Sequence, residues 1–148
     1  MHYISHRGNI EGPNPNREND PSYIREAIRR GYEVEIDVWR KNGSFYLGHD
    51  RAQYRVDFKF LQNKRLWCHA KNIEALSELL KHRKRIHCFW HEEDNYAITS
   101  KGYIWAYPGN IDGNTIVVMP EKYNLNPSRS ARGVCSDYIK EYKSPRRD

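Results

Sequence analysis

The segment Tyr32–Trp39 reads YEVEIDVW, and this stretch decides the fold. Side chains alternate across a β-strand, so one face of the segment is apolar and carries Val34, Ile36 and Val38. The opposite face carries Glu33, Glu35, Asp37 and Trp39. An apolar face packed against helices is typical of a strand in an α/β protein.

The acidic face of this strand has two interpretations. Adjacent carboxylates on an enclosed face repel each other and lose their hydration, which is unfavourable without a partner. A bound divalent cation removes that conflict, and oxygen ligands favour Mg²⁺ or Ca²⁺. Alternatively, the strand lies in an antiparallel sheet with one face in water, and Glu33, Glu35 and Asp37 simply meet solvent. This segment alone does not separate the two interpretations.

Helix and turn signals surround the strand. Asp20-Pro21 is typical of a helix start, because Asp caps the first turn and Pro fits the first helical position, and Gly31 is a natural stop. Apolar spacing predicts a second helix over Ile73–His82. A first strand over Tyr3–Ser5, then helix, then strand predicts parallel βα units. Further strands are predicted over Ser44–Leu47, Arg65–Ala70, Arg85–Trp90, Ile98–Thr99, Tyr103–Ala106, Thr115–Met119 and Gly133–Tyr138.

The chain is short and basic, with 148 residues, 25 basic and 19 acidic side chains and a formal net charge of +6. This length predicts one domain over residues 1–142, followed by a basic tail over 143–148. No apolar run approaches the ~20 residues of a membrane-spanning helix, and the first residues do not resemble a secretory leader. Three cysteines between apolar neighbours are typical of buried free thiols in a cytoplasmic protein: Cys68, Cys88 and Cys135.

Two histidines follow predicted strands. His6 lies in His6-Arg7-Gly8, directly after the first strand, and His49 lies in Gly48-His49-Asp50, after the hairpin that follows the acidic strand. The strand ends of parallel α/β folds gather functional groups in their loops. Beside a metal, a pair of histidines can serve as general acid and general base in phosphoryl chemistry.

In their order, these motifs resemble those of a known family, the glycerophosphodiester phosphodiesterases, which belong to the phosphatidylinositol phospholipase C-like phosphodiesterase barrels. The likeness is dense over residues 3–50, about a third of the chain. Its motifs are His6-Arg7-Gly8, Glu18-Asn19, a helix ending in Gly31, Glu35-Ile36-Asp37-Val38 and Gly48-His49-Asp50. Trp67–Lys71 resembles the strand of this family that carries a metal-binding carboxylate two residues before a lysine, and Val134–Tyr138 resembles its closing strand.

The resemblance implies the central roles of the reaction. His6 and His49 would be the acid and base pair, and Glu35 and Asp37 would hold the divalent metal, with Mg²⁺ expected first and Ca²⁺ or Mn²⁺ as alternatives. In such enzymes the metal and one histidine promote attack on phosphorus by a neighbouring hydroxyl of the substrate. The other histidine protonates the departing oxygen.

The resemblance also implies supporting roles. Arg7 and Lys71 would contact the phosphate oxygens of a small-molecule phosphodiester. Glu18 and Asn19 would support the site, with Glu18 a candidate partner of Arg7.

One position departs from the pattern of the family, because the usual carboxylate before Lys71 is His69. His69 and Lys71 are two residues apart, so they face the same side of their strand and the correspondence is geometrically sensible. Imidazole can replace an oxygen ligand, but it moves the preference toward Mn²⁺, Zn²⁺ or Fe²⁺ and away from Ca²⁺. The alternative is that His69 supports the site or packs in the core without touching the metal.

The second departure is size. A complete (β/α)₈ barrel takes ~250 residues, so 148 residues cannot supply eight strands each with a full helix. The sequence predicts an α/β fold of the minimal or truncated TIM type, a (β/α) barrel with several helices reduced to loops. Strand faces left without a helix would need another covering surface, so a homodimer is also predicted.

The motif HCFWH over 87–91 suggests zinc at first sight. On a strand, however, Cys88 would point away from both His87 and His91, so a zinc site built from all three is not expected. His91 either lines the substrate pocket or begins an acidic surface turn. The aromatic residues of this half of the chain are expected in the core rather than on a stacking platform: Trp90, Tyr103, Trp105 and Tyr107.

The sequence suggests three functions. The leading hypothesis is a metal-dependent phosphodiesterase acting on a glycerophosphodiester or related phosphoryl-alcohol diester. The alternative is a catalytically inactive relative that binds phosphorylated ligands, suggested by His69 and by the missing helices. The positive charge also suggested a nucleic-acid binder, but no segment resembles a nucleic-acid-binding motif, so nucleic acid is not an expected partner.

Overall fold

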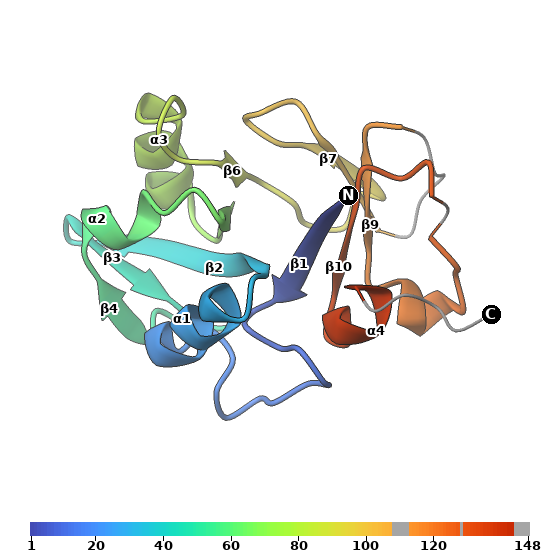
Figure 1. Cartoon of the computed structure of the whole chain (residues 1–148). Helices are drawn as coiled ribbons and strands as arrows, with labels where there is room; N and C mark the ends of the chain where they lie inside the picture. The colour runs from blue at the N-terminus through green and yellow to red at the C-terminus, as the bar shows by residue number, and fades with distance from the viewer. Residues whose placement is uncertain (108–112, 128, 144–148) are drawn as a thin grey trace.

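The computed structural model describes residues 1–107, 113–127 and 129–143 (Figure 1). Strands and short helices alternate along the chain. They are β1 (His2–His6), α1 (Pro21–Arg29), β2 (Glu33–Lys41), β3 (Ser44–Leu47), β4 (Tyr54–Val56), α2 (Phe58–Leu61), β5 (Leu66–Ala70), α3 (Ile73–Lys81), β6 (Cys88–Phe89), β7 (Tyr96–Ile98), β8 (Ile104–Ala106), β9 (Thr115–Val118), the 3₁₀ helix η1 (Pro120–Tyr123), β10 (Gly133–Ser136) and α4 (Ile139–Lys143).

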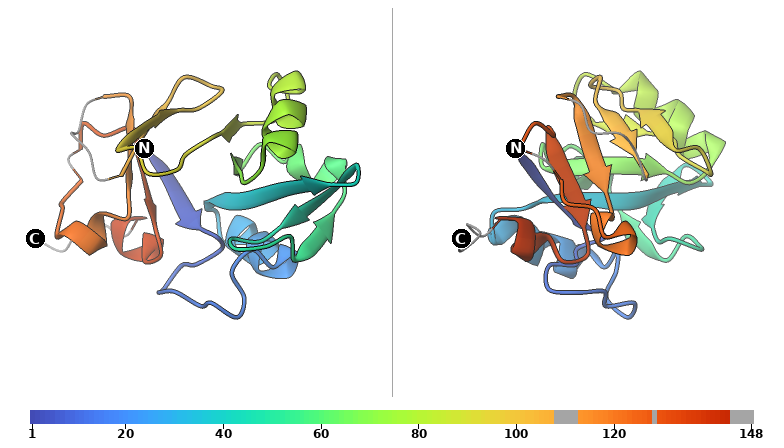
Figure 2. Two further views of the ribbon diagram at one scale, coloured as in Figure 1. Left: turned by 180° about the vertical axis from the view of Figure 1, so that it is seen from behind. Right: turned by 90° about the vertical axis from the view of Figure 1, so that its right-hand side faces the viewer.

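The strands form one open, mostly parallel sheet of ten strands. The ladder β6-β5-β2-β1-β10-β9-β8 is parallel throughout, and β3, β4 and β7 join it by antiparallel pairing. Figure 2 shows β1, in blue, between the C-terminal strands in orange and red and β2 in cyan. The mixed α/β class with parallel strands is confirmed, but no strand ladder closes this sheet into the predicted barrel within the described residues.

Strand β2 lies inside the sheet and, as its longest strand, pairs with three others. β5 pairs along one edge from Val34 to Val38, while β1 pairs with the first half of the other edge. β3 continues that same edge from Val38 to Lys41. The short interval between β1 and β3 leaves the backbone of Asp37 without a strand partner on that side, and loop residues fill this interval.

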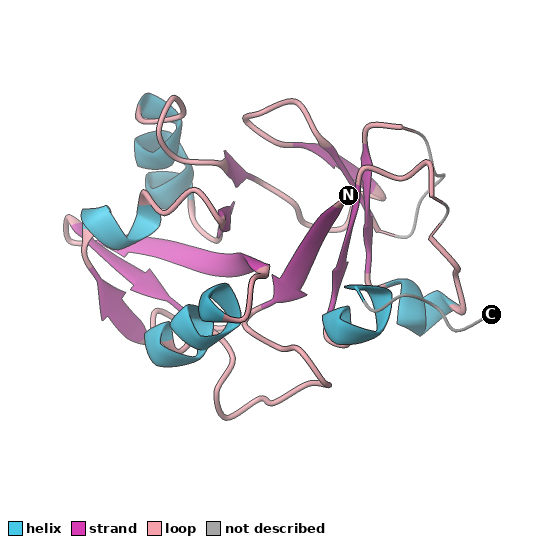
Figure 3. Ribbon diagram, in the orientation of Figure 1, coloured by secondary structure: helices cyan, strands magenta, loops and turns pink. Residues whose placement is uncertain are grey.

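The predicted alternation of β2 is confirmed. Val34, Ile36 and Val38 are fully buried in the outer core, the apolar cluster between the sheet and the helices, which also contains Ile24 and Ala27 of α1 and Ala75 and Leu79 of α3. Figure 3 shows these helices on the periphery of the strands. The opposite face packs on the inner core, a cluster of Ile4, Trp67, Phe89, Trp105, Ile116, Val118, Met119 and Cys135.

The interpretation that placed the acidic face of β2 in water is wrong for two of its three carboxylates. Asp37 is 0% exposed and Glu35 is 2% exposed, because β2 lies inside a parallel ladder and its second face covers the inner core. Glu33 is partly buried and accepts hydrogen bonds from His2 Nδ1 at 2.8 Å and from Trp67 Nε1 at 2.5 Å.

The local signals for the first helix are confirmed. The Asp20 side chain accepts a hydrogen bond from Ser22 N, Pro21 occupies the first turn, and Gly31 follows the helix with φ of +86°. The second helix ends at Lys81, with Asn72 as its cap. Unpredicted elements are β4, α2, η1 and α4, each of five residues or fewer.

Four further expectations concern the fold. Lys143 ends helix α4 and donates a hydrogen bond to Gly31 O, so the predicted tail does not begin there, and residues 144–148 lie outside the described residues. The three cysteines are free and buried, as predicted. The homodimer stays a prediction: every residue of β9 and β10 is buried in the single chain, whereas Tyr96 and Ile98 of β7 are exposed. No helix among the described residues has the length and apolarity needed to cross a bilayer.

Candidate functional site

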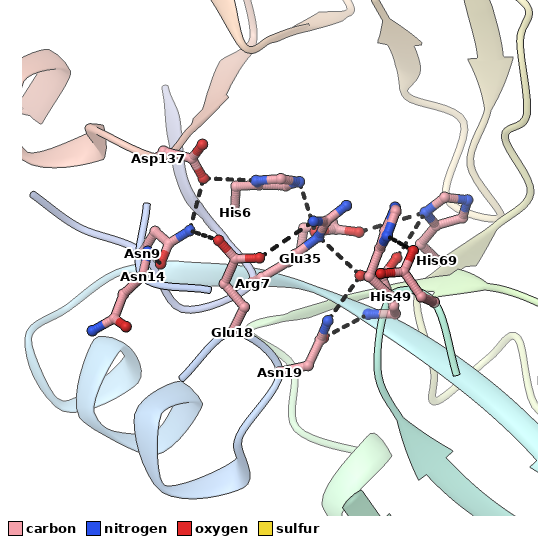
Figure 4. Close-up of polar contacts among 12 residues, drawn as sticks. His6, Arg7, Asn9, Asn14, Glu18, Asn19, Glu35, His49, His69 and Asp137 are labelled. Carbon is pink, nitrogen blue, oxygen red and sulfur yellow. Dashed lines mark hydrogen bonds and ion pairs between the residues drawn. The ribbon is translucent and has the colours of Figure 1, made fainter. Parts of the chain in front are cut away.

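The candidate site lies on the inner face of the sheet, where β1, β2 and β5 run side by side. The strand register places His6 of β1 beside Glu35 of β2, and Asp37 of β2 beside His69 of β5. Paired residues of parallel neighbours point to the same face, so these four side chains converge over the inner core. Figure 4 shows them joined in one network of polar contacts.

Glu35, Asp37 and His69 form the one group of potential metal ligands found in the described part of the chain, with one ligand atom from each residue within 4.8 Å of the others. His69 Nδ1 lies 3.6 Å from Glu35 Oε1 and 3.3 Å from Asp37 Oδ1. The structure therefore brings the two predicted carboxylate ligands together with the histidine that replaces the third.

The donor set fits a divalent cation. Glu35 Oε2 and Asp37 Oδ1 are buried and, among the described residues, make no hydrogen bond. Unsatisfied carboxylate oxygens in a buried position are strongly unfavourable, whereas coordination to a cation satisfies them. Two carboxylates and one imidazole leave coordination positions open for water or substrate.

The orientation of His69 is set by its other nitrogen. His69 Nε2–H donates to the carbonyl oxygen of His91 at 2.8 Å, and the ring stacks on Phe89 with centroids 5.0 Å apart. Nδ1 therefore faces the two carboxylates. Burial lowers the pKa of His69, but the adjacent carboxylates of Asp37 and Glu35 outweigh burial and raise it to about 9. Metal binding at Nδ1 would displace that proton.

Two residues of the loop between β1 and α1, Arg7 and Asn19, hold the carboxylate of Asp37 in place. Asn19 Nδ2 donates to Asp37 Oδ2 at 2.8 Å, and Asn19 Oδ1 accepts from Asp37 N at 2.9 Å. Arg7 Nε lies 3.0 Å from Asp37 Oδ2. Burial alone would raise the pKa of Asp37, but the imidazole of His69 and the charge of Arg7 hold it well below its usual range.

His6 is oriented by a residue that the sequence analysis did not assign, Asp137. His6 Nδ1 donates to Asp137 Oδ1 at 2.7 Å, which leaves Nε2 directed toward the cavity, 3.9 Å from Glu35 Oε2. Burial raises the pKa of Asp137, but its hydrogen bond with His6 and the charge of that ring outweigh burial and lower it. A signal for Asp137 was present, since it lies near the end of the predicted strand Gly133–Tyr138, and functional groups of parallel folds gather where strands end.

Asn9 and Glu18 link the His6–Asp137 pair to Arg7, which contacts Asp37. Asn9 Nδ2 donates to Asp137 Oδ1 at 2.8 Å and to Glu18 Oε1 at 2.9 Å. The other oxygen of Glu18 accepts from Arg7 Nη1 at 3.3 Å, the pairing expected for Glu18. Asn9 is fully buried but belonged to no recognised motif, so sequence reasoning missed it.

The loop between β3 and β4 places His49 at the rim of the site. Gly48 has φ of +151°, and a Cβ there would collide with the backbone carbonyl of Arg51, so only glycine fits this turn. Trp39 Nε1 donates to Gly48 O at 2.6 Å and fixes the turn to β2. His49 Nδ1 lies 2.7 Å from Asp50 Oδ1, and the side chain is 45% exposed.

A cavity of about 500 Å³ opens above the carboxylates. One part is polar and cationic, and the other is aromatic or apolar. The lining residues are His6, Arg7, Glu35, His49, His69, Ala70, Lys71, Trp90, His91, Glu92, Trp105, Tyr107, Val118, Met119 and Lys122.

The predicted phosphate contact Lys71 lines this cavity, and its Nζ lies 4.0 Å from Asp37 Oδ1. Of the aromatic residues assigned to the core, Trp105 is buried there and also reaches the cavity wall with Trp90 and Tyr107. His91 lines the cavity as one interpretation had it, and its Nε2 donates to Asp94 O at 2.5 Å.

The expectation that HCFWH forms no zinc site agrees with the geometry of the described residues. Cys88 is buried in the outer core, on the side of the sheet opposite Phe89. His87 Nε2 lies 2.7 Å from Thr99 Oγ1, and the ring packs on Trp67 with centroids 4.1 Å apart.

Comparisons of the chain with protein families, with curated proteins and with solved structures found no match. The resemblance of the motifs to glycerophosphodiester phosphodiesterases therefore stays a prediction, and the geometry of the site carries the functional argument.

Proposed function

We propose that this chain is a metal-dependent phosphodiesterase that hydrolyses a glycerophosphodiester or a related phosphoryl-alcohol diester. One observation carries the proposal: a buried Glu35–Asp37–His69 set with unsatisfied carboxylate oxygens lies beneath a cavity whose lining includes His6 and His49. Paired acid and base groups beside a cation site suit the displacement of an alcohol from phosphorus.

The cationic residues of the cavity suit a phosphate diester. When bound, a divalent cation would supply charge to a phosphoryl oxygen and lower the pKa of a coordinated hydroxyl. Arg7 and Lys71 line the cavity beside Asp37 and would hold the remaining phosphate oxygens. Fixed positive groups stabilise the negative charge that develops on these oxygens in the transition state.

His6 is assigned the role of general base. Its Nδ1–H donates to Asp137, so the lone pair of the neutral ring lies on Nε2, at the cavity. The attacking hydroxyl, from the substrate or from water, gives its proton to this nitrogen as its oxygen bonds to phosphorus.

His49 is assigned the role of general acid. It lies at the exposed rim of the cavity, where an alcohol can leave. The bond between phosphorus and the leaving oxygen breaks as His49 supplies a proton to that oxygen, and the two histidines exchange their protons with water afterwards. The first step then releases one alcohol and leaves either a cyclic phosphate or an open monoester.

The fold proposed for this activity is a reduced (β/α) barrel. Two hydrogen bonds support it: Ser100 N donates to Cys88 O at 2.8 Å, and Cys88 N donates to Ser100 Oγ at 2.9 Å. They join the last parallel strand at one edge of the sheet, β6, to the turn of the β7–β8 hairpin at the other edge. The functional groups gather at one end of the strands, as in barrel enzymes.

The test is the release of alcohol from glycerophosphodiesters in the presence of Mg²⁺, Mn²⁺ or Ca²⁺. We expect hydrolysis by the wild-type chain and a loss of at least about 100-fold in His6→Ala and in His49→Ala. His82, the C-cap residue of α3, has a 40% exposed side chain, so His82→Gln is the matched control and keeps full activity. Undiminished activity in both His6→Ala and His49→Ala would refute the proposal.

A second candidate function, binding of phosphorylated ligands without turnover, is favoured by His69. The ion pairs of this ring with both carboxylates let a protonated imidazole occupy the place of the cation. This function predicts that inorganic phosphate and glycerol 3-phosphate bind equally well with and without a chelator. Calorimetry separates the two candidates, because a phosphodiesterase that uses a cation loses affinity for these anions when the cation is removed.

A further inference from the structure

The third ligand of the candidate metal centre is a nitrogen. Glu35 and Asp37 each offer an oxygen, and His69 offers Nδ1, all within 4.8 Å. The neighbouring Cys68 faces the outer core, so it supplies no thiolate on this side of the sheet. The donor set is therefore two carboxylates and one imidazole.

The structure fixes His69 in the orientation that a ligand needs. The hydrogen on Nε2 is committed to the carbonyl oxygen of His91 at 2.8 Å, so the neutral ring carries its lone pair on Nδ1. Stacking on Phe89, with an interplanar angle of 9°, resists rotation of the ring. Ligand histidines are typically oriented by a carbonyl or carboxylate in this way.

We propose that His69 makes this centre selective for Mn²⁺ over Mg²⁺ and Ca²⁺. The inference rests on the proposed function only in assigning the same cluster to a metal. Mg²⁺ and Ca²⁺ are hard ions that take oxygen ligands, and an imidazole in place of a carboxylate removes both an oxygen and a negative charge. Mn²⁺ accepts carboxylates as readily and gains more from a nitrogen donor, because it stands above these ions in affinity for nitrogen.

The environment of the two carboxylates supports this choice. Asp37 Oδ2 is already engaged by Asn19 and Arg7, which leaves Oδ1 as its free ligand atom. A single oxygen from Asp37 cannot provide the bidentate carboxylate that often completes the seven or so ligands of Ca²⁺. Of the two carboxylates only Glu35 could then bind through both oxygens, so together they offer at most three, well short of the ligand number of Ca²⁺.

The experiment measures metal binding to the complete chain without substrate. Mn²⁺, Mg²⁺ and Ca²⁺ are titrated into metal-free protein by calorimetry, and bound Mn²⁺ is examined by pulsed electron paramagnetic resonance. We expect Mn²⁺ to bind at least about 100-fold more tightly than Mg²⁺ or Ca²⁺. We also expect a ¹⁴N coupling from a directly bound imidazole.

Two variants identify the nitrogen. In His69→Asp the ¹⁴N coupling disappears and the preference for Mn²⁺ over Mg²⁺ narrows to less than about 10-fold, because the site becomes all-oxygen. His91→Ala is the matched control: this histidine lines the same cavity, and its alanine variant keeps the backbone carbonyl that orients His69. It should retain both the coupling and the preference.

Three results would overturn the inference: no Mn²⁺ binding by the wild-type chain, similar affinities for Mn²⁺ and Mg²⁺, or bound Mn²⁺ without ¹⁴N coupling. In the first case, the ion pairs of His69 with both carboxylates would take the place of the cation, as in the second candidate function. The electron paramagnetic resonance spectrum of Mn²⁺ bound to the wild-type chain tests for the nitrogen ligand even if His69→Asp fails to fold. Because no step involves hydrolysis, an inactive but Mn²⁺-selective chain would refute the proposed phosphodiesterase while leaving this inference intact.

Discussion

Replacement of Asn19 by alanine should destabilise the chain more than its single small side chain suggests. Asn19 is 1% exposed, and its amide makes two hydrogen bonds to one residue, Asp37, at 2.8 and 2.9 Å. One of them satisfies the backbone N–H of Asp37 in the interval between β1 and β3. In Asn19→Ala this N–H is buried without a partner, and the carboxylate loses a donor.

The magnitude follows from these contacts. An unsatisfied buried N–H costs about 1–3 kcal/mol, and a hydrogen bond to a charged group contributes about 1.5–3 kcal/mol. Asn19 has φ of +63°, where alanine adds about 1–2 kcal/mol of strain. We expect the free energy of unfolding to fall by about 3.5–8 kcal/mol in total, the sum of these three ranges.

Two matched variants divide this total. Asn19→Gly removes the same hydrogen bonds without the strain, so it should be about 1–2 kcal/mol less damaging than Asn19→Ala. Asn42→Ala tests the strain alone, because Asn42 has φ of +50° in an exposed turn. It should cost about 1–2 kcal/mol.

The assay is urea unfolding followed by tryptophan fluorescence, with a chelator present so that a bound ion does not stabilise the folded state. Equal losses in Asn19→Ala and Asn42→Ala would refute the reasoning, because the two hydrogen bonds to Asp37 would then contribute nothing.

Three further results are expected. Asp137→Ala should lower the rate of diester hydrolysis by about 100- to 10,000-fold in steady-state assays, because His6 loses the acceptor that fixes its tautomer; a rate within threefold of wild type would exclude this positioning role. A divalent ion at 100 times its Kd should stabilise the wild-type chain by about 2.7 kcal/mol in thermal melts but leave Asp37→Asn unchanged, and an equal shift in both would place the ion elsewhere. Burial lowers the pKa of His87 from 6.5 to about 3, so below pH 6.5 the unfolded chain binds a proton that the folded chain does not. The free energy of unfolding should therefore fall with decreasing pH by up to about 1.4 kcal/mol per unit between these values, and His87→Gln should remove this part of the acid sensitivity when the two pH profiles are compared.

The acidic strand β2 shows which structural features a local sequence pattern can predict. Alternation alone predicted which side chains of Tyr32–Trp39 share a face, because the period of a strand is fixed by its backbone. It could not decide whether the acidic face meets water, since that depends on which strands flank β2. The parallel partners β1 and β5 settle this question for Glu35 and Asp37.

The sequence predicted most residues of the site but not the contacts among them. His6, Glu35, Asp37 and His69 lie together because of strand register, and spacing within one strand carries no information about the neighbouring strand. The orienting residues were harder to find. Asn9 has no motif of its own, and its role arises only where the loop after β1 meets Asp137, far away in the sequence.

The shared edge of β2 has a consequence for engineering. The β3 hairpin pairs with β2 only from Val38 onward, so its tip and length can change while the register of Glu35 and Asp37 with β1 and β5 stays the same. The loop between β3 and β4, which carries His49, can thus be changed while strands β1, β2 and β5 keep their arrangement. A library that diversifies residues 50–53 while keeping Gly48 and His49 would vary the rim of the cavity, and under the proposed function its preference for leaving groups, without rebuilding the remainder of the scaffold.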